Sequence, residues 1–154
     1  MRTALVSFSL LAASGGPGLA DNDAVARELK ALAGSWKLVS VEVDGKPVPK
    51  GDLPAISFTL HPDGRSTVRT PDGEFQTKSV IAPGKTPKAF DIEYLGGPLK
   101  GQKQYGIYKV EGHRWTVFST PPGGKPEDRP RAFDSKTAKG ALVVWERVKH
   151  DKKR

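Results

Sequence analysis

The side chains able to bind a metal or transfer a proton are few and widely separated in this sequence. The chain has three histidines and no cysteine, which excludes disulfides, thiolate metal sites and cysteine nucleophiles. His61 and His113 lie beside turn signals, and His150 lies near the C-terminus. None of them has a carboxylate or a second histidine at the spacing of a metal site. We therefore expect exposed histidines, no metal site and no cofactor.

Two pairs of acidic residues also deserve a test against known chemistry. Asp91 and Glu93 lie on one face of an alternating segment, and a glycosidase could use such a pair of carboxylates. They occupy its polar phase, so a solvated surface is the simpler interpretation. Asp63 and Asp72 each lie in a Pro-Asp-Gly triplet. A calcium cage needs further oxygen ligands in series, and these triplets lack them, so we interpret both as turns.

Nucleotide and acyl-transfer chemistry lack their usual sequence signatures. Residues 84–86, Gly-Lys-Thr, resemble the end of a phosphate-binding loop. The leading glycine of that motif is replaced by Ser79, and Pro87 follows where a helix must begin. The Gly-x-Ser-x-Gly motif of serine hydrolases is absent. The sequence therefore predicts that the protein is not an enzyme and has no catalytic residues.

The elements that position these side chains are short strands joined by turns. The chain has 17 glycines and 13 prolines, many in short clusters, which is typical of strands separated by turns. Apolar and polar residues alternate in segments such as 56–60 and 90–94, and the Pro-Asp-Gly triplets predict tight hairpins. About eight strands follow from this pattern, over residues 36–43, 56–60, 65–70, 74–81, 90–94, 103–110, 115–117 and 141–148. Since antiparallel strands must hide their edges, we predict an all-β fold, an antiparallel up-and-down barrel of about eight strands.

The two ends of the chain differ in character from this central part. One arginine, an apolar run over residues 4–13 and small residues at 18 and 20 predict a signal peptide over residues 1–20, with an N-terminal anchor as the alternative. We expect an extracytoplasmic protein, periplasmic or secreted, that does not span the membrane after cleavage. Helical spacing predicts a short helix over residues 21–33. Residues 34–148 form the expected barrel domain, and residues 149–154 a basic tail.

The net charge of the chain is +8. Basic proteins bind anionic partners readily, but the lysines and arginines here are scattered through turns, which favours a solvated basic surface. No interleaving of aromatic and basic residues indicates nucleic-acid binding. The long segment from Pro121 to Gly140 is rich in proline, glycine and charge. It predicts a mobile loop on one rim, with a short strand at residues 131–133 as an option.

Three residues indicate how the barrel is closed. Gly34 and Trp36 begin the first expected strand directly after the helix, and Arg147 lies in the last. This arrangement resembles the lipocalins, in which an arginine from a late strand lies across the tryptophan at one end of the barrel. First and last strands pair in a closed barrel, so we predict a contact between Trp36 and Arg147. Such a contact gains cation–π energy.

A closer resemblance covers residues 30 to 148. The run from Leu32 to Pro49, with residues 87–92, 106–108, 121–123 and 142–147, is similar to a lipocalin-like domain of unknown function that is abundant in planctomycete bacteria. This resemblance implies the fold and no catalytic residues.

The interior of the barrel decides between the remaining functions. Several aromatic residues fall on the more apolar phases of their strands, and a core filled by them is slightly favoured over a pocket for a small apolar ligand. The leading function hypothesis is a non-catalytic protein that binds a small hydrophobic molecule. The alternative is an interaction or structural module of the cell envelope without a pocket. The candidate pocket residues are Phe58, Phe90, Tyr94, Tyr105 and Trp115.

Overall fold

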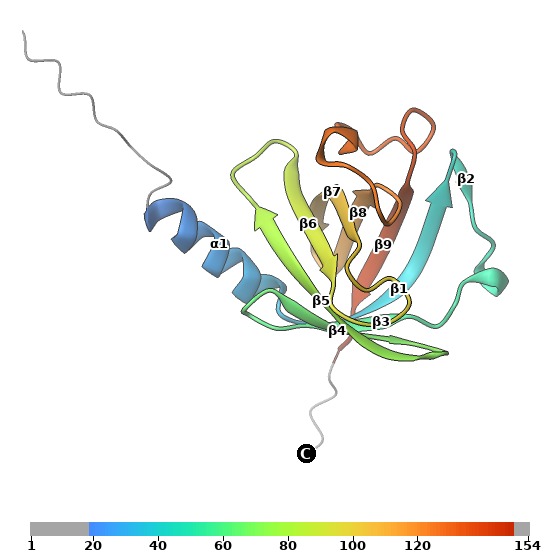
Figure 1. Ribbon diagram of the computed structural model, residues 1–154, viewed down its shortest axis with the longest axis horizontal. Helices are drawn as coiled ribbons and strands as arrows, with labels where there is room; N and C mark the ends of the chain where they lie inside the picture. The colour runs from blue at the N-terminus through green and yellow to red at the C-terminus, as the bar shows by residue number, and fades with distance from the viewer. Residues whose placement is uncertain (1–18, 150–154) are drawn as a thin grey trace, which may run out of the picture.

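The structure of the chain is a computed structural model that describes residues 19–149. It begins with one helix, α1 (Leu19–Leu32), which leads directly into a single curled sheet of nine strands. Most of the predicted signal peptide and the basic tail from His150 onward lie outside the described residues. Figure 1 shows the helix at one side of the sheet.

The sheet closes into a barrel because its first and last long strands pair. Each strand is antiparallel to its neighbours, and β1 pairs with both β3 and β9. Eight strands therefore form the closed barrel, while the two-residue β2 pairs with the far end of β1. The predicted all-β up-and-down barrel is confirmed. The strands are β1 (Gly34–Val43), β2 (Lys46–Pro47), β3 (Ser57–Leu60), β4 (Arg65–Thr70), β5 (Gly73–Ala82), β6 (Lys88–Tyr94), β7 (Lys103–Glu111), β8 (Arg114–Ser119) and β9 (Ala141–Arg147).

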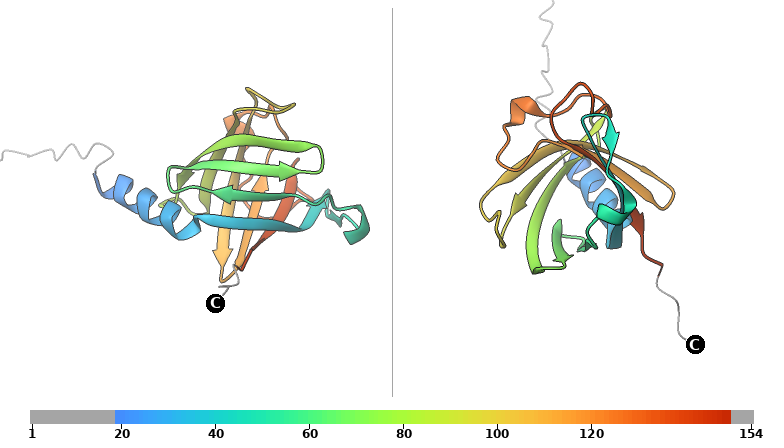
Figure 2. Two further views of the ribbon diagram at one scale, coloured as in Figure 1. Left: turned by 90° about the horizontal axis from the view of Figure 1, so that it is seen from below. Right: turned by 90° about the vertical axis from the view of Figure 1, so that its right-hand side faces the viewer.

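The helix α1 covers one end of this barrel. It begins two residues before the predicted range of 21–33 and ends one residue before its end. Leu29 and Leu32 are buried in the main core, and Val25 packs against it. The C-terminal turns of α1 therefore seal this end, while its first turn projects away from the barrel (Figure 2).

The closed end is organised by Gly34, Trp36 and Arg147. Trp36 lies directly opposite Arg147 in the β1–β9 ladder, and the guanidinium lies over the indole ring. The predicted contact between these two residues is confirmed. Gly34 has a φ of +125°, and a Cβ atom there would lie 3.1 Å from the Arg147 guanidinium. Glycine is required at this position both by the backbone and by the space that Arg147 occupies.

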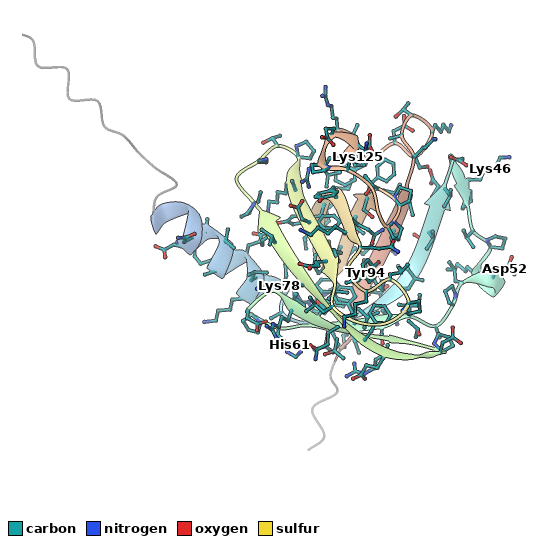
Figure 3. The ribbon with its side chains drawn as sticks, in the orientation of Figure 1. Lys46, Asp52, His61, Lys78, Tyr94 and Lys125 are labelled. Atoms are coloured by element: carbon teal, nitrogen blue, oxygen red, sulfur yellow. The ribbon has the colours of Figure 1, made fainter. Side chains whose placement is uncertain are left out.

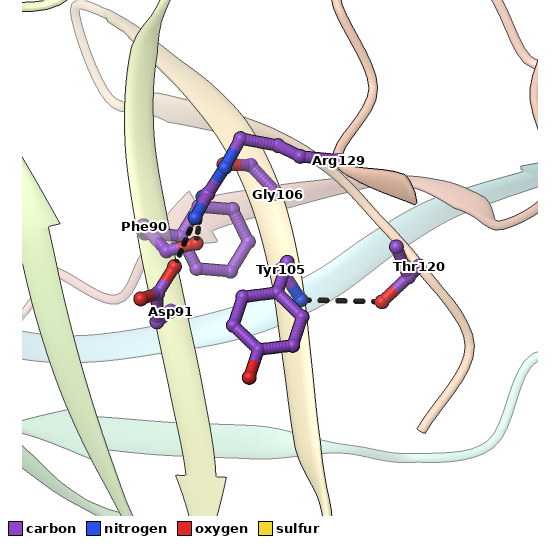
Figure 4. Close-up of polar contacts among 6 residues, drawn as sticks. All are labelled: Phe90, Asp91, Tyr105, Gly106, Thr120 and Arg129. Atoms are coloured by element: carbon purple, nitrogen blue, oxygen red, sulfur yellow. Dashed lines mark hydrogen bonds and ion pairs between the residues drawn. The ribbon is translucent and has the colours of Figure 1, made fainter. Parts of the chain in front are cut away.

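The segment from Pro121 to Gly140 differs from the loop that the sequence predicts. Residues 131–133 form a bend instead of a strand. The segment lies against the outer face of the sheet, where the Phe133 ring is 5.1 Å from the Lys109 ammonium. It is held at two points, by Arg129 on β6 and β7 (Figure 4) and by the buried Ser135 near the β1–β2 turn. The prediction of a mobile rim loop misses these anchors.

Candidate ligand-binding cavity

Aromatic rings fill the barrel near α1. Trp115 lies at their centre, with its ring centroid 5.2 Å from that of Trp36, 5.6 Å from that of Phe58 and 6.1 Å from that of Tyr108. All three pairs are edge-to-face, the arrangement that aromatic quadrupoles favour. Trp36 and Tyr108 are almost completely buried. The half of the barrel next to α1 is therefore a packed core, and it closes the interior at that end.

The other half of the barrel contains a cavity of about 300 Å³. Its floor is formed by side chains that belong both to the packed core and to the cavity lining, namely Phe58, Ile81, Phe90 and Trp115. Its lining continues to residues at the opposite ends of the strands, such as Thr70 at the end of β4 and Ala141 at the start of β9. The cavity thus leads from the aromatic core toward the end of the barrel away from α1.

Four of the five predicted pocket residues line this cavity: Phe58, Phe90, Tyr94 and Trp115. In the view of Figure 3, Tyr94 lies near the centre of the molecule, whereas Lys46 and Lys125 lie at its edge. Tyr105 is the exception. Its neighbour Gln104 faces the cavity, so the alternation of the strand turns Tyr105 outward. There the Arg129 guanidinium lies 5.6 Å from its ring (Figure 4).

The interior is only half filled, although the sequence slightly favours a filled core. The reason is the size of the inward side chains of β4 and β5, which are small over most of their length. Ser66, Thr77 and Ser79 face the interior between larger neighbours, and aromatic rings on the other strands do not reach across the space that they leave. An eight-stranded barrel is wide enough to be filled or to hold one small ligand, and this one is filled at the end near α1 and hollow toward the other end.

A pair of hydrogen-bonded polar side chains faces the cavity from β6 and β7. The Tyr94 hydroxyl donates to Gln104 Oε1 over 2.6 Å, and Gln104 Nε2 donates to the Thr120 carbonyl over 2.9 Å. Burial raises the pKa of Tyr94 above its ordinary value, because the phenolate loses solvation there. Tyr94 therefore stays a neutral hydroxyl across the physiological range.

Sequence reasoning missed the polar part of the cavity lining. The sequence pattern predicts only aromatic pocket residues, whereas Ser66, Thr77 and Gln104 also line the cavity. The pattern carried a signal only for Thr77, which lies two residues from Phe75, an aromatic residue on the apolar phase of β5. Gln104 is next to Tyr105, the residue predicted to face inward, so the same pattern placed Gln104 on the outside. A polar side chain on an inward phase indicates either a buried hydrogen bond or a ligand contact.

The other candidate residues lie apart from the cavity. His61 and His113 are exposed in turns, and Asp91 pairs with Arg129 on the outer face. Within residues 19–149 no group of three metal-ligating side chains comes together. None of the described helices is long and apolar enough to cross a membrane.

The fold and the cavity define a class of protein. A closed eight-stranded antiparallel barrel preceded by a short helix, with an interior cavity, is a lipocalin-like barrel compatible with ligand binding. Comparisons with protein-family models, curated proteins and solved structures gave no match.

Proposed function

We propose that the protein is a non-catalytic binding protein that holds one small, mainly apolar molecule in its barrel. The observation that supports this function is the cavity of about 300 Å³ between the aromatic core and the barrel mouth. An apolar cavity of about 150 Å³ holds benzene, so this volume suits a molecule with a single ring and a short side chain. It lies at the lower end of the range for ligand sites, about 300–1,000 Å³.

The chemistry of the lining supports binding over catalysis. The described side chains around the cavity are apolar, hydroxyl or amide groups. General acid–base catalysis near neutral pH needs a group that titrates close to that pH. Tyr94 is the titratable side chain of the lining, and burial moves its pKa further from neutrality. We therefore propose a binding role and assign no catalytic residue.

We also propose that the protein acts outside the cytoplasm and belongs with the lipocalin-like domains of planctomycete bacteria. The support for both comes from the sequence. Residues 1–20 have the charge, apolar run and small residues of a signal peptide, and residues 30 to 148 carry the resemblance. Fractionation of cells that express the full chain tests export, and N-terminal sequencing of the exported form tests cleavage after Ala20.

Ligand binding is tested by titration with butylbenzene and 3-phenyl-1-propanol. Trp115 and Trp145 line the cavity, so tryptophan emission reports binding, and isothermal titration calorimetry gives the affinity. At roughly 0.5 kcal/mol per non-hydrogen atom, we expect a Kd of about 0.1–0.5 mM. If no compound of this size binds more tightly than about 1 mM, equivalent to about 4 kcal/mol, the proposal fails.

A matched pair of variants locates the binding site. Val117 and Val143 face each other across β8 and β9 and line the cavity, so Val117→Phe with Val143→Phe places two rings in it and partly fills it. We expect this variant to weaken binding at least about tenfold. Val80→Phe is the control, because Val80 is 62% exposed on the outside of β5. Equal affinity in the filled variant and the control would place the ligand elsewhere.

A further inference from the structure

Four polar residues of the cavity lining form one continuous band. Ser66 lies directly opposite Thr77 in the β4–β5 ladder, and Thr77 directly opposite Tyr94 in the β5–β6 ladder. Side chains paired in this way have Cβ atoms about 4.5–5.5 Å apart. Tyr94 then bonds Gln104 on β7. The band therefore crosses four neighbouring strands, whereas β8 and β9 present mainly apolar side chains such as Val117 and Val143.

Two hydroxyls in this band make no side-chain hydrogen bond within residues 19–149. Ser66 is 5% exposed and Thr77 is 4% exposed, and neither oxygen is among the fully buried polar atoms that lack a partner, so each can be reached from the cavity. Both line the cavity. Buried hydroxyls are nearly always hydrogen-bonded, and each can donate one bond and accept two. Water or a ligand group inside the cavity therefore supplies their partners.

The lining also disfavours a charged group on the ligand. No Lys, Arg, His, Asp or Glu lies among the described residues around the cavity, although the whole chain carries 25 basic and 17 acidic residues. An ion taken from water into such a site loses its hydration and gains no counter-charge, at a cost of several kcal/mol. A hydroxyl or carbonyl group of a ligand loses less, because the band can bond it.

We propose that the cavity selects an uncharged amphiphile, with an apolar body against β8 and β9 and a hydroxyl or carbonyl group bonded to Ser66 and Thr77. This inference rests on the proposed binding function and adds the class of ligand to it. The cavity then disfavours fatty acids and other carboxylates, because their ionised head group finds no cation in the lining. It also disfavours hydrocarbons, because they give the hydroxyls of Ser66 and Thr77 no hydrogen-bond partner.

Four compounds with the same phenylpropyl body test this selectivity: 3-phenyl-1-propanol, butylbenzene, 3-phenylpropanoate and 3-phenylpropylammonium. Affinities are measured by calorimetry at pH 7. We expect the alcohol to bind about 3–10-fold more tightly than butylbenzene, the range of one net hydrogen bond, and at least about 30-fold more tightly than either ion. If the carboxylate or butylbenzene binds as tightly as the alcohol, the selectivity is wrong and the cavity still binds ligands. If none of the four binds, the proposed function itself fails.

The double variant Ser66→Ala, Thr77→Val assigns the selectivity to the band. We expect its affinity for the alcohol to fall to that of butylbenzene, with butylbenzene itself unchanged. The control is Ser35→Ala, Thr59→Val, which removes the same atoms from a pair facing each other across β1 and β3. This pair lies on the outer phase, since Trp36 and Phe58 beside it face inward. If the Ser66 and Thr77 variant binds the alcohol as tightly as the control does, those hydroxyls bond only water, and the assignment is overturned.

Discussion

The guanidinium carbon of Arg147 lies 4.4 Å from the ring centroid of Trp36. Two nitrogens of the same guanidinium donate to the carbonyls of Ala33 and Ala31, at 2.9 and 2.8 Å. These carbonyls belong to the last turn of α1 and the residue after it. Carbonyls at a helix C-terminus lack partners within the helix. Arg147 therefore joins three parts of the fold: the last strand, the indole of β1 and the end of the helix.

The first prediction concerns this junction. Arg147→Lys keeps the charge and loses the planar group that stacks and bonds two carbonyls at once. We expect the free energy of unfolding in urea to fall by about 1–3 kcal/mol. Trp36→Ala, which empties a fully buried site, costs about 3–5 kcal/mol. Arg114→Lys, at an exposed position on β8, is the control and stays within about 0.5 kcal/mol. If both lysine variants lose a similar free energy of unfolding, Arg147 does not stabilise the closed end of the barrel.

The second prediction compares two buried indoles. Trp36 Nε1 donates to the Leu32 carbonyl over 2.9 Å, whereas Trp115 Nε1 is buried without a hydrogen-bond partner among the described residues. Replacement of each by phenylalanine removes similar apolar area. Only Trp36→Phe breaks a hydrogen bond and leaves the Leu32 carbonyl without that partner. We expect Trp36→Phe to cost about 1–3 kcal/mol more than Trp115→Phe in urea unfolding. Equal costs, or the reverse order, would contradict this assignment.

The third prediction concerns high pH. Burial, and then the charge and hydrogen bond of Glu28, raise the pKa of Tyr108. In the unfolded chain a tyrosine ionises near pH 10, while in the fold Tyr108 stays neutral. Its contribution to stability is thus fully present below about pH 10 and is lost as the pH rises above it, by about 1.4 kcal/mol per pH unit. We expect urea unfolding at pH 11 to show a smaller loss of stability in Tyr108→Phe than in the parent. If the variant and the parent lose equal stability at pH 11, a group other than Tyr108 is responsible for the loss.

The sequence was sufficient for the architecture because the architecture depends on patterns that are local in the chain. Alternation located the strands, and Pro-Asp-Gly located two of the hairpins. Gly64 and Gly73 in these turns have φ values of +90° and +143°, the region that glycine adopts at little cost. The pairing of Trp36 with Arg147 followed from closure, since the first and last strands of a closed barrel must be neighbours.

The content of the barrel could not be predicted in the same way. On β7 both phases carry apolar residues, because Ile107 is buried on the outer face beside Phe118 of β8. Period-two alternation shows which residues share a face, but it does not show which face is inside when both are covered. The sequence therefore predicts Tyr105 on the inner face, whereas it lies on the outer one. The cavity depends on the summed volume of side chains from many strands, which no single segment reports.

The fourth prediction concerns the anchor of the 121–140 segment. One Arg129 nitrogen donates to the carbonyls of Phe90 and Gly106, at 2.7 and 2.9 Å, and another pairs with Asp91. Arg129→Met keeps much of the apolar stem and removes these bonds. We expect a loss of about 1.5–3 kcal/mol in stability and faster amide hydrogen exchange across residues 121–140. Exchange is expected to change little around Trp36, because the closed end has its own core.

The control is Arg131→Met, since Arg131 is exposed in the same segment. If Arg129→Met and Arg131→Met leave the exchange of the segment equally slow, Ser135 alone holds it. The buried Ser135 hydroxyl donates to Glu42 and accepts from the Gly45 amide, so Ser135→Ala then becomes the variant expected to release it.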